Sequence, residues 1–262
     1  MRLGIQSGLR WNGATVGALI ALSLFLGSCT AAETPIAEEI PAAAPVDVAQ
    51  MPSAAEMTAG LPRLNGKATA EIKVGSKVIT VELDGDKAPV TAGNFVDLAQ
   101  KGVYDGTIFH RVVRSPEPFV AQGGDPQSKD PGIPINQLGT GGYEENGRER
   151  TIPLEILPVG AEQPVYGQTF PEAGISEKPV LDHKRGAIAM ARSGVNTASA
   201  QFYITLADVA FLDGNYAVFG YVTEGMDVVD NIRLEDVIQS VTITSGADNL
   251  VTADAAAEPA AE

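Results

Sequence analysis

The central part of this chain, residues 65–245, consists of short β-prone runs separated by turns that contain glycine. The first two runs, residues 68–74 and 77–83, are separated only by Gly75 and Ser76, which fits the two-residue turn of a β-hairpin. Later runs of the same kind are TIFHRVV, FVAQ, GAIAMA, QFYIT, AVFGYV and VIQSVTI. Many short strands joined by tight turns predict an all-antiparallel sheet that curls into a barrel.

Only two segments have helical features. Pro89 begins a segment in which Phe95, Leu98 and Ala99 recur at helical spacing, and Gly102 stands where a C-terminal capping glycine belongs. The second segment is MDVVDNI, residues 226–232. The fold class predicted from these runs is mainly β: a closed antiparallel barrel capped by two α-helices. Residues 125–184 are rich in glycine, proline and charge, which predicts long loops that carry function or specificity.

The two ends of the chain differ from the middle. Arg2 and Arg10 precede an apolar run, residues 14–26, which has the length of a secretory signal core and is too short to span a bilayer comfortably. The run ends in LGSC, which resembles the lipobox of bacterial lipoproteins. That resemblance implies cleavage before Cys29 and lipidation of its thiol. An ordinary signal peptide and a retained anchor are the alternatives.

Composition sets the expected segment boundaries. We expect a signal peptide over residues 1–28 and a flexible Ala/Pro/Glu tether over residues 29–64, because such a sequence cannot bury enough apolar surface to order itself. The folded domain is expected over residues 65–245, and a disordered acidic tail over residues 246–262.

Charge and composition exclude several kinds of function. The formal net charge is −15, which argues against binding to a nucleic-acid backbone. The chain has one cysteine, two histidines and neither a CxxC nor an HExxH motif, so we expect no metal site. GTGGYEENG lacks the GK[ST] ending of a phosphate loop, and no GxSxG supports a serine hydrolase.

Arg111 is the one charged residue in the apolar run TIFHRVV. Its guanidinium stays charged at any workable pH, so it must face solvent or serve a task. Taken alone, a surface arginine whose stem lies along apolar surface is the simpler interpretation.

Three blocks change that interpretation: FHRVV…PFVAQGGD, MARSGVNTASAQFYI and FLDGNYAVFG. Together they strongly resemble the cyclophilin family of peptidyl-prolyl cis/trans isomerases, and the resemblance covers roughly residues 67–243. It implies an eight-stranded barrel with an active groove on its outer face. It also implies an activity that needs no cofactor, which agrees with the absence of metal and phosphate motifs. The segments GTGGYEENGRERTIPLEI and PVYGQTF are similar to the longer loops of cyclophilins from cyanobacteria and chloroplast lumens.

The resemblance also implies the site. The expected catalytic residues are Arg111, Phe119 and Gln122. The expected substrate-binding residues are Val120, Ala191, Arg192, Ser193, Gln201, Tyr203, Phe211, Leu212 and Tyr216. Phe202 is expected in the barrel core and His110 in a structural role, whereas His183 has no assigned task.

The chemistry of proline isomerisation suits these residue types. Rotation about an Xaa–Pro amide has a barrier of about 18–20 kcal/mol, and no bond is broken. The twisted transition state leaves a lone pair on the prolyl nitrogen, so a fixed donor aimed at that atom stabilises it selectively. The guanidinium of Arg111 can donate there, an apolar pocket can hold the proline ring, and Gln122 can orient Arg111 and bind the peptide backbone.

The sequence departs from the family pattern at three places. RSPEP makes the connection between Arg111 and Phe119 longer than usual, and it forms either a bulge that preserves the site or a register slip that destroys it. Phe211 replaces a tryptophan that helps many relatives to bind cyclosporin, which puts sensitivity to that drug in doubt. Tyr216 replaces a histidine but keeps an aromatic wall.

Two functional hypotheses follow. The first is an exported, monomeric isomerase that assists folding by acting on proline-containing segments of other exported proteins. It is expected to be held at a membrane by lipidated Cys29 and to face the periplasm, with the soluble periplasm or the thylakoid lumen as alternatives. The second is a tethered chaperone or scaffold that binds proline-containing segments with little turnover.

Overall fold

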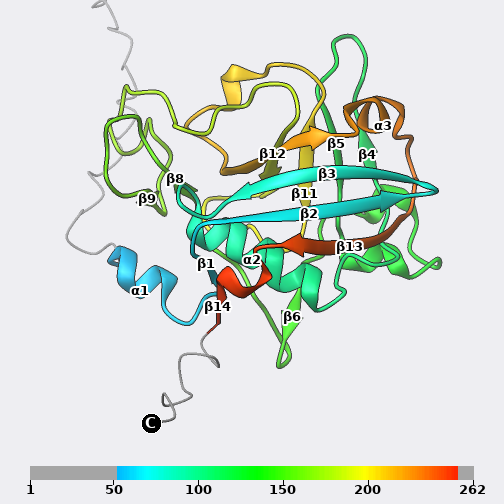
Figure 1. Cartoon of the computed structure of the whole chain (residues 1–262), viewed down its shortest axis with the longest axis horizontal. Coiled ribbons are helices and arrows are strands. Elements are labelled where there is room, and N and C mark those ends of the chain that lie inside the picture. Colours follow the sequence, from blue (N-terminus) through cyan, green and yellow to red (C-terminus); the bar gives the residue numbers. More distant parts are fainter. Residues whose placement is uncertain (1–51, 253–262) are drawn as a thin grey trace, which may run out of the picture. The chain divides into compact units, whose positions relative to one another are not determined.

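The computed structural model of the chain describes residues 52–252 (Figure 1). Signal peptide, Cys29 and most of the predicted tether and acidic tail lie outside the described residues. The helices are α1 (Ala54–Thr58), α2 (Pro89–Gln100) and α3 (Met226–Asn231), with 3₁₀ turns η2 (Pro126–Lys129), η3 (Ile135–Gln137), η4 (Ala210–Leu212) and η5 (Ala247–Asn249). The strands are β1 (Arg63–Leu64), β2 (Lys67–Val74), β3 (Lys77–Asp84), β4 (Arg111–Val112), β5 (Val120–Gly123), β6 (Glu144–Glu145), β7 (Arg148–Glu149), β8 (Glu155–Ile156), β9 (Val165–Tyr166), β10 (Ala187–Met190), β11 (Phe202–Thr205), β12 (Val218–Glu224), β13 (Ile238–Ser245) and β14 (Leu250–Val251).

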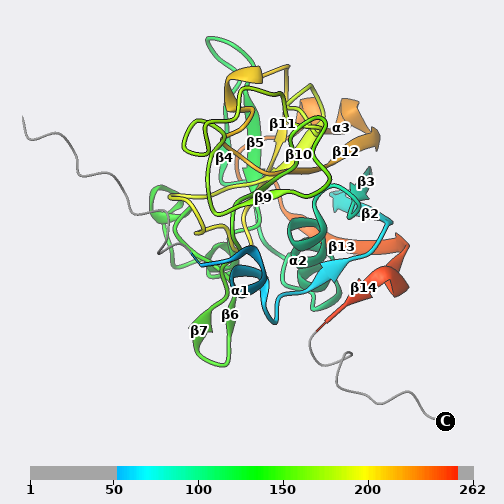
Figure 2. The same ribbon diagram turned by 90° about the vertical axis from the view of Figure 1, so that its left-hand side faces the viewer.

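The main sheet has eight strands in the order β13-β2-β3-β12-β10-β11-β5-β4, and every neighbouring pair is antiparallel. The prediction of a closed barrel is wrong, because the ladder ends at β13 and β4 and the sheet is an open, curled half-barrel (Figure 2). Near the opening, an isolated bridge joins Ile108 to Val237, and the amide of Phe109 donates to the carbonyl of Asp236 at 2.9 Å. β4 is only two residues long, so it offers too little backbone for a continuous ladder to β13.

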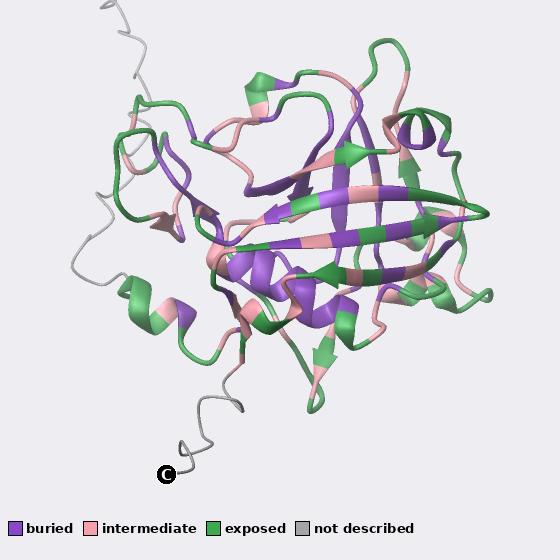
Figure 3. Ribbon diagram, viewed as in Figure 1, coloured by how far each residue is buried: buried purple, intermediate pink, exposed green. Residues whose placement is uncertain are grey.

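The predicted hairpin is confirmed in β2 and β3. Val74 pairs with Lys77, so the turn has two residues, and Gly75 adopts a φ of 61° that favours glycine. The side chains of both strands alternate between buried and exposed, as expected for a sheet with one face on a core (Figure 3).

Both predicted helices are present. α2 begins at Pro89, and ten of its twelve residues are buried, with its apolar side chains in the same hydrophobic core as those of β2 and β3 (Figure 3). Gly102 follows α2 with a φ of 65°, which confirms the predicted capping position. Four fully buried aromatic residues lie at the centre of this core. The ring centre of Phe95 in α2 is 4.9 to 5.4 Å from the ring centres of Tyr104, Phe202 and Phe219. The expectation that Phe202 belongs to the core is confirmed.

The folded region begins before residue 65 and ends after residue 245. β1 pairs with β14 in register Arg63↔Val251 and Leu64↔Leu250, and Leu64 is fully buried. α1 lies earlier still, capped by Ser53, whose hydroxyl accepts from the amide of Glu56. A composition rich in alanine, proline and glutamate therefore did not mark where the folded region starts.

Candidate active site

The β4–β5 hairpin places the expected catalytic residues side by side. Arg111 pairs with Gln122 and Val112 pairs with Ala121. Beyond these pairs, the amide of Val113 donates to the carbonyl of Val120 at 2.9 Å, and the amide of Phe119 donates to the carbonyl of Val113 at 3.0 Å. RSPEP therefore lies wholly in the connecting loop, residues 114–118, and the two strands keep the register that puts Arg111 beside Gln122.

The longer loop is tied to the rest of the domain by Arg114. Its Nη2 atom donates to the carbonyl oxygens of Val229, Asp230 and Ile232 at 3.2, 2.7 and 2.8 Å. These carbonyls lie at the C-terminal end of α3, where a cation is favoured by the unpaired carbonyl groups. The base of the loop is thus anchored next to the strand that carries Arg111.

A pocket of about 270 Å³ opens beside Arg111. All nine residues that line it are among the expected site residues: Arg111, Phe119, Val120, Gln122, Ala191, Arg192, Tyr203, Leu212 and Tyr216. The interior is mostly aromatic and aliphatic, whereas the guanidinium of Arg111 lies at the solvent side with its Cζ 5.5 Å from the centre of the Phe119 ring. The pocket therefore combines an apolar interior with a fixed positive charge at its edge.

A chain of side-chain amides orients that charge. Nη1 of Arg111 donates to Oε1 of Gln122 at 3.4 Å, Nε2 of Gln122 donates to Oε1 of Gln201 at 3.1 Å, and Nε2 of Gln201 donates to the carbonyl of Gly141 at 2.8 Å. Each amide uses its oxygen towards Arg111 and its nitrogen away from it. Gln122 and Gln201 therefore link the guanidinium of Arg111 to the buried loop at Gly141 through a continuous chain of hydrogen bonds.

A second cavity of about 380 Å³ adjoins the first. It shares Gln122, Ala191 and Arg192 with the pocket, and Ser193 and Gln201 line it. Phe211 lines neither cavity. The residue is 71% exposed, and its ring stacks on that of Phe119 with ring centres 5.6 Å apart, which places it at the rim of the pocket.

Comparison with known proteins identifies the family. Residues 69–249 match the family model described as "Cyclophilin type peptidyl-prolyl cis-trans isomerase/CLD". The chain belongs to the cyclophilin family. A thylakoid lumen peptidyl-prolyl cis-trans isomerase named in Synechocystis sp. is 41% identical over 207 residues, covering 75% of this chain and 52% of that protein. The chloroplastic isomerase CYP38 of Arabidopsis thaliana is 36% identical over 211 residues, covering 72% of this chain and 45% of that protein.

The cyclophilin fold is confirmed by solved structures as well. The crystal structure of a cyclophilin-type isomerase from Cryptosporidium parvum has a TM-score of 0.51 and 24% identity, covering 68% of this chain and 98% of that one. A shorter relative, the isomerase of Helicobacter pylori strain 26695, is 33% identical over 180 residues, covering 68% of this chain and 88% of that protein. The chain spans about half the length of its Synechocystis and Arabidopsis relatives.

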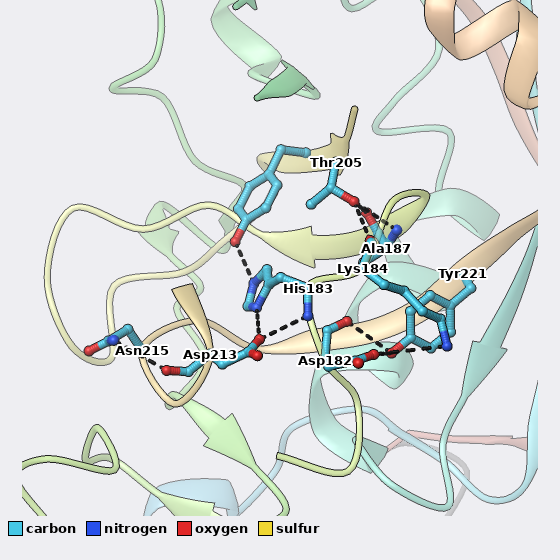
Figure 4. A network of polar contacts seen from close by, with 9 residues as sticks. Asp182, His183, Lys184, Ala187, Thr205, Asp213, Asn215 and Tyr221 are labelled. Atoms are coloured by element: carbon cyan, nitrogen blue, oxygen red, sulfur yellow. Dashed lines mark hydrogen bonds and ion pairs between the residues drawn. The ribbon is translucent and has the colours of Figure 1, made fainter. Parts of the chain in front are cut away.

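One feature of this cyclophilin's pocket was not predicted from the sequence. His183, which had no assigned task, is buried behind Tyr203, and its Nε2 lies 3.0 Å from the Tyr203 hydroxyl. Its Nδ1 lies 2.8 Å from Oδ1 of Asp213 (Figure 4). Burial lowers the pKa of His183, although Asp213 acts in the opposite direction. Asp213 is 30 residues away in the chain, so no local motif reveals the pair.

His110 lies next to Arg111 in sequence and is also buried. Burial lowers the pKa of His110, although the nearby carboxylate of Asp125 acts in the opposite direction. Across residues 52–252, no helix has the length and apolar character needed to cross a membrane, and no group of three or more His, Cys, Asp or Glu side chains is placed to hold a metal ion.

Proposed function

We propose that this chain is a peptidyl-prolyl cis/trans isomerase in which Arg111 is the catalytic residue. The observation that carries the proposal is the placement of an always-charged guanidinium at the edge of an apolar pocket of about 270 Å³, with Gln122 directly beside it. Membership of the cyclophilin family supports it.

The geometry suits the reaction step by step. Phe119, Leu212 and Tyr203 offer the proline ring an apolar surface, so the ring is held while the preceding carbonyl rotates. As the amide twists, its nitrogen gains a lone pair, and an N–H of Arg111 stabilises that state more than the planar one. Gln122 holds the guanidinium in place through its oxygen.

The experiment measures the cis-to-trans rate of a short Xaa-Pro peptide with the wild type and with Arg111→Ala. We expect kcat/KM to fall about 100-fold or more in the variant, the scale seen when one preorganised donor to a transition state is removed. Arg233→Ala is the matched control, because Arg233 is exposed and lines neither cavity of the site. Normal turnover in Arg111→Ala would refute the mechanism. No acceleration by the wild type would favour the alternative, a scaffold that binds proline-containing segments.

We further propose that the substrates are proline-containing segments of exported proteins, and that the enzyme assists their folding at a membrane surface through lipidated Cys29. The names of the Synechocystis and Arabidopsis relatives, which refer to the thylakoid lumen and the chloroplast, support export. A related structure was solved in the presence of the dipeptide Ala-Pro, which supports the substrate class. The LGSC motif supports lipidation, and each buried methylene of an acyl chain would add about 0.8 kcal/mol of membrane affinity.

The anchor has a direct test. Cell fractionation compares the wild type with Cys29→Ala, and we expect the wild type in the membrane fraction and the variant in the soluble fraction. Equal membrane association of both would refute lipidation and favour a retained apolar anchor. A soluble wild type would favour an ordinary signal peptide.

A further inference from the structure

We propose that Asp213, His183 and Tyr203 form a positioning network. It holds the side chain of Tyr203 in place against Leu212 and Tyr216, which line the same pocket of about 270 Å³. The inference rests on the proposed function, because it concerns the same pocket. His183 and Asp213 line neither cavity, so they are positioning residues that act through Tyr203 and η4.

His183 connects three segments with its four polar atoms. Its backbone amide and its Nδ1 both bond to Oδ1 of Asp213 at 2.8 Å. Its carbonyl accepts from the amide of Val209 at 2.8 Å. Its Nε2 bonds to the hydroxyl of Tyr203 at 3.0 Å. Val209 and Asp213 flank η4, so His183 joins η4 to β11, which carries Tyr203.

These connections reach the pocket directly. Tyr203 lines the pocket and is 5% exposed. Leu212, in η4, and Tyr216, whose amide bonds to the carbonyl of Leu212, line it as well. The rings of Tyr203 and Tyr216 meet edge to face, with centres 6.1 Å apart. The positions of all three pocket side chains therefore depend on the segments that His183 joins.

The hydrogen-bond pattern fixes the tautomer of His183. A carboxylate accepts only, so Nδ1 carries the hydrogen and donates it to Asp213. Nε2 is then an acceptor, and the Tyr203 hydroxyl must donate to it. A buried hydroxyl without a partner is unfavourable, so this bond selects one position for the Tyr203 ring.

Protonation of His183 would change the direction of its bond to Tyr203. Nε2 would become a donor, and the hydroxyl hydrogen of Tyr203 would lose its acceptor. The other ionisable groups near His183 are Asp213, Asp182 and, through its ion contact with Asp182 at 3.9 Å, Lys184. Around Tyr203 they are Tyr216 and Arg192. Asp213 and Asp182 favour the charged imidazole, whereas burial opposes it and lowers the pKa of His183. The hydroxyl of Tyr203 therefore donates to His183 at neutral pH, and this bond reverses its direction once His183 takes up a proton.

The test measures KM and kcat from pH 8 to pH 5 with a blocked Ala-Pro peptide that has no ionisable group. For the wild type we expect KM to rise as His183 becomes protonated, and because burial lowers the pKa of His183 this rise falls at the acid end of the range. For Tyr203→Phe we expect KM at pH 8 to be about threefold to tenfold higher, the scale of one lost hydrogen bond, with no further rise from His183 in acid. In His183→Gln the amide oxygen can accept from Tyr203 and does not titrate, so we expect a KM near that of the wild type at pH 8 and a flatter acid limb.

Tyr143→Phe is the matched control. Its hydroxyl donates to Glu145 at 3.4 Å and lines neither cavity of the site, so the variant loses a tyrosine hydroxyl bond outside the network. We expect its KM and pH profile to match those of the wild type. His110, the other histidine, keeps its titration in every variant, so differences between profiles report on His183.

The two proposals fail separately. If the wild type accelerates isomerisation and both Tyr203→Phe and His183→Gln reproduce its KM and acid limb, the network is refuted and the proposed function stands. If the wild type does not accelerate isomerisation, the proposed function is refuted, and the same pH comparison is made on the dissociation constant of the peptide, measured by NMR. If Tyr203→Phe does not fold, His183→Gln decides the network by its acid limb alone.

Discussion

Arg111 depends on one neighbouring side chain for its orientation. Oε1 of Gln122 is the one side-chain acceptor for its guanidinium within residues 52–252, at 3.4 Å. We expect Gln122→Ala to lower kcat/KM about tenfold, because the guanidinium then samples more orientations and the net value of a hydrogen bond to a charged group is about 1.5 kcal/mol or more. Steady-state kinetics on the same Xaa-Pro peptide measure the effect. Gln239→Ala, at an exposed position of β13, serves as the control, and equal rates for both variants would show that Gln122 does not orient Arg111.

At this scale, the sequence predicts side chains that lie within contiguous motifs better than partners that the fold supplies. Arg111, Phe119 and Gln122 lie in one block, and the antiparallel register brings them to one pocket. By contrast, the partners of His183 come from β11 and from the segment after η4. Alternation and motif spacing carry no information about which distant hydroxyl or carboxylate a buried imidazole meets.

The β4–β5 hairpin is the element on which the site depends, and β4 lies at the edge of the sheet. Arg114 anchors the base of its loop to three carbonyls at the end of α3. We expect Arg114→Ala to increase hydrogen exchange at the amides of Val113 and Phe119, because their bonds across the base of the loop open more often once the anchor is gone.

Exchange measured by NMR for Arg114→Ala and for Arg148→Ala tests this prediction. Arg148 is exposed and pairs with another strand, so its loss leaves the hairpin unchanged. Unchanged protection of both amides in Arg114→Ala would show that the loop is held without the anchor.

Glu155 binds the N-terminal end of α2. It is buried, and its carboxylate accepts from the amides of Val90 and Thr91, from the Thr91 hydroxyl and from the Tyr166 hydroxyl. We expect Glu155→Ala to lower the free energy of unfolding by about 3 kcal/mol or more, because it leaves several buried donors without a partner. Urea unfolding measures the change, with exposed Glu162→Ala as the control. A loss equal to that of the control would mean that water replaces the carboxylate.

Elements with a strong local pattern were predicted correctly, and elements that depend on a distant partner were not. The β2–β3 hairpin has alternation and a two-residue turn, and α2 has a proline start and a glycine cap. β1 and β14 have two residues each, which is too short for any periodicity, and each is a strand only because the other pairs with it. The same limit explains why closure at β4 was predicted wrongly.

The whole molecule buries both of its histidines, and this gives its stability a pH dependence. Burial lowers the pKa of His110 and of His183 below the ordinary value of 6.5. Between the lowered and the ordinary values the unfolded chain binds more protons than the folded one, so the free energy of unfolding falls as the pH falls through this window.

The prediction is a larger loss of stability in acid for the wild type than for His183→Gln. Between pH 7.5 and pH 5.5, the free energy of unfolding that the wild type loses through His183 is at most about 1.4 kcal/mol, since a histidine in the unfolded chain titrates near 6.5. Burial raises the pKa of Glu155, which acts in the opposite direction, but Glu155 is present in both proteins and cancels in the comparison. Urea unfolding at the two pH values measures the difference. Parallel losses in the two proteins would mean that His183 titrates in the folded state as it does in the unfolded chain, and the buried imidazole between Asp213 and Tyr203 would then have no electrostatic consequence for the fold.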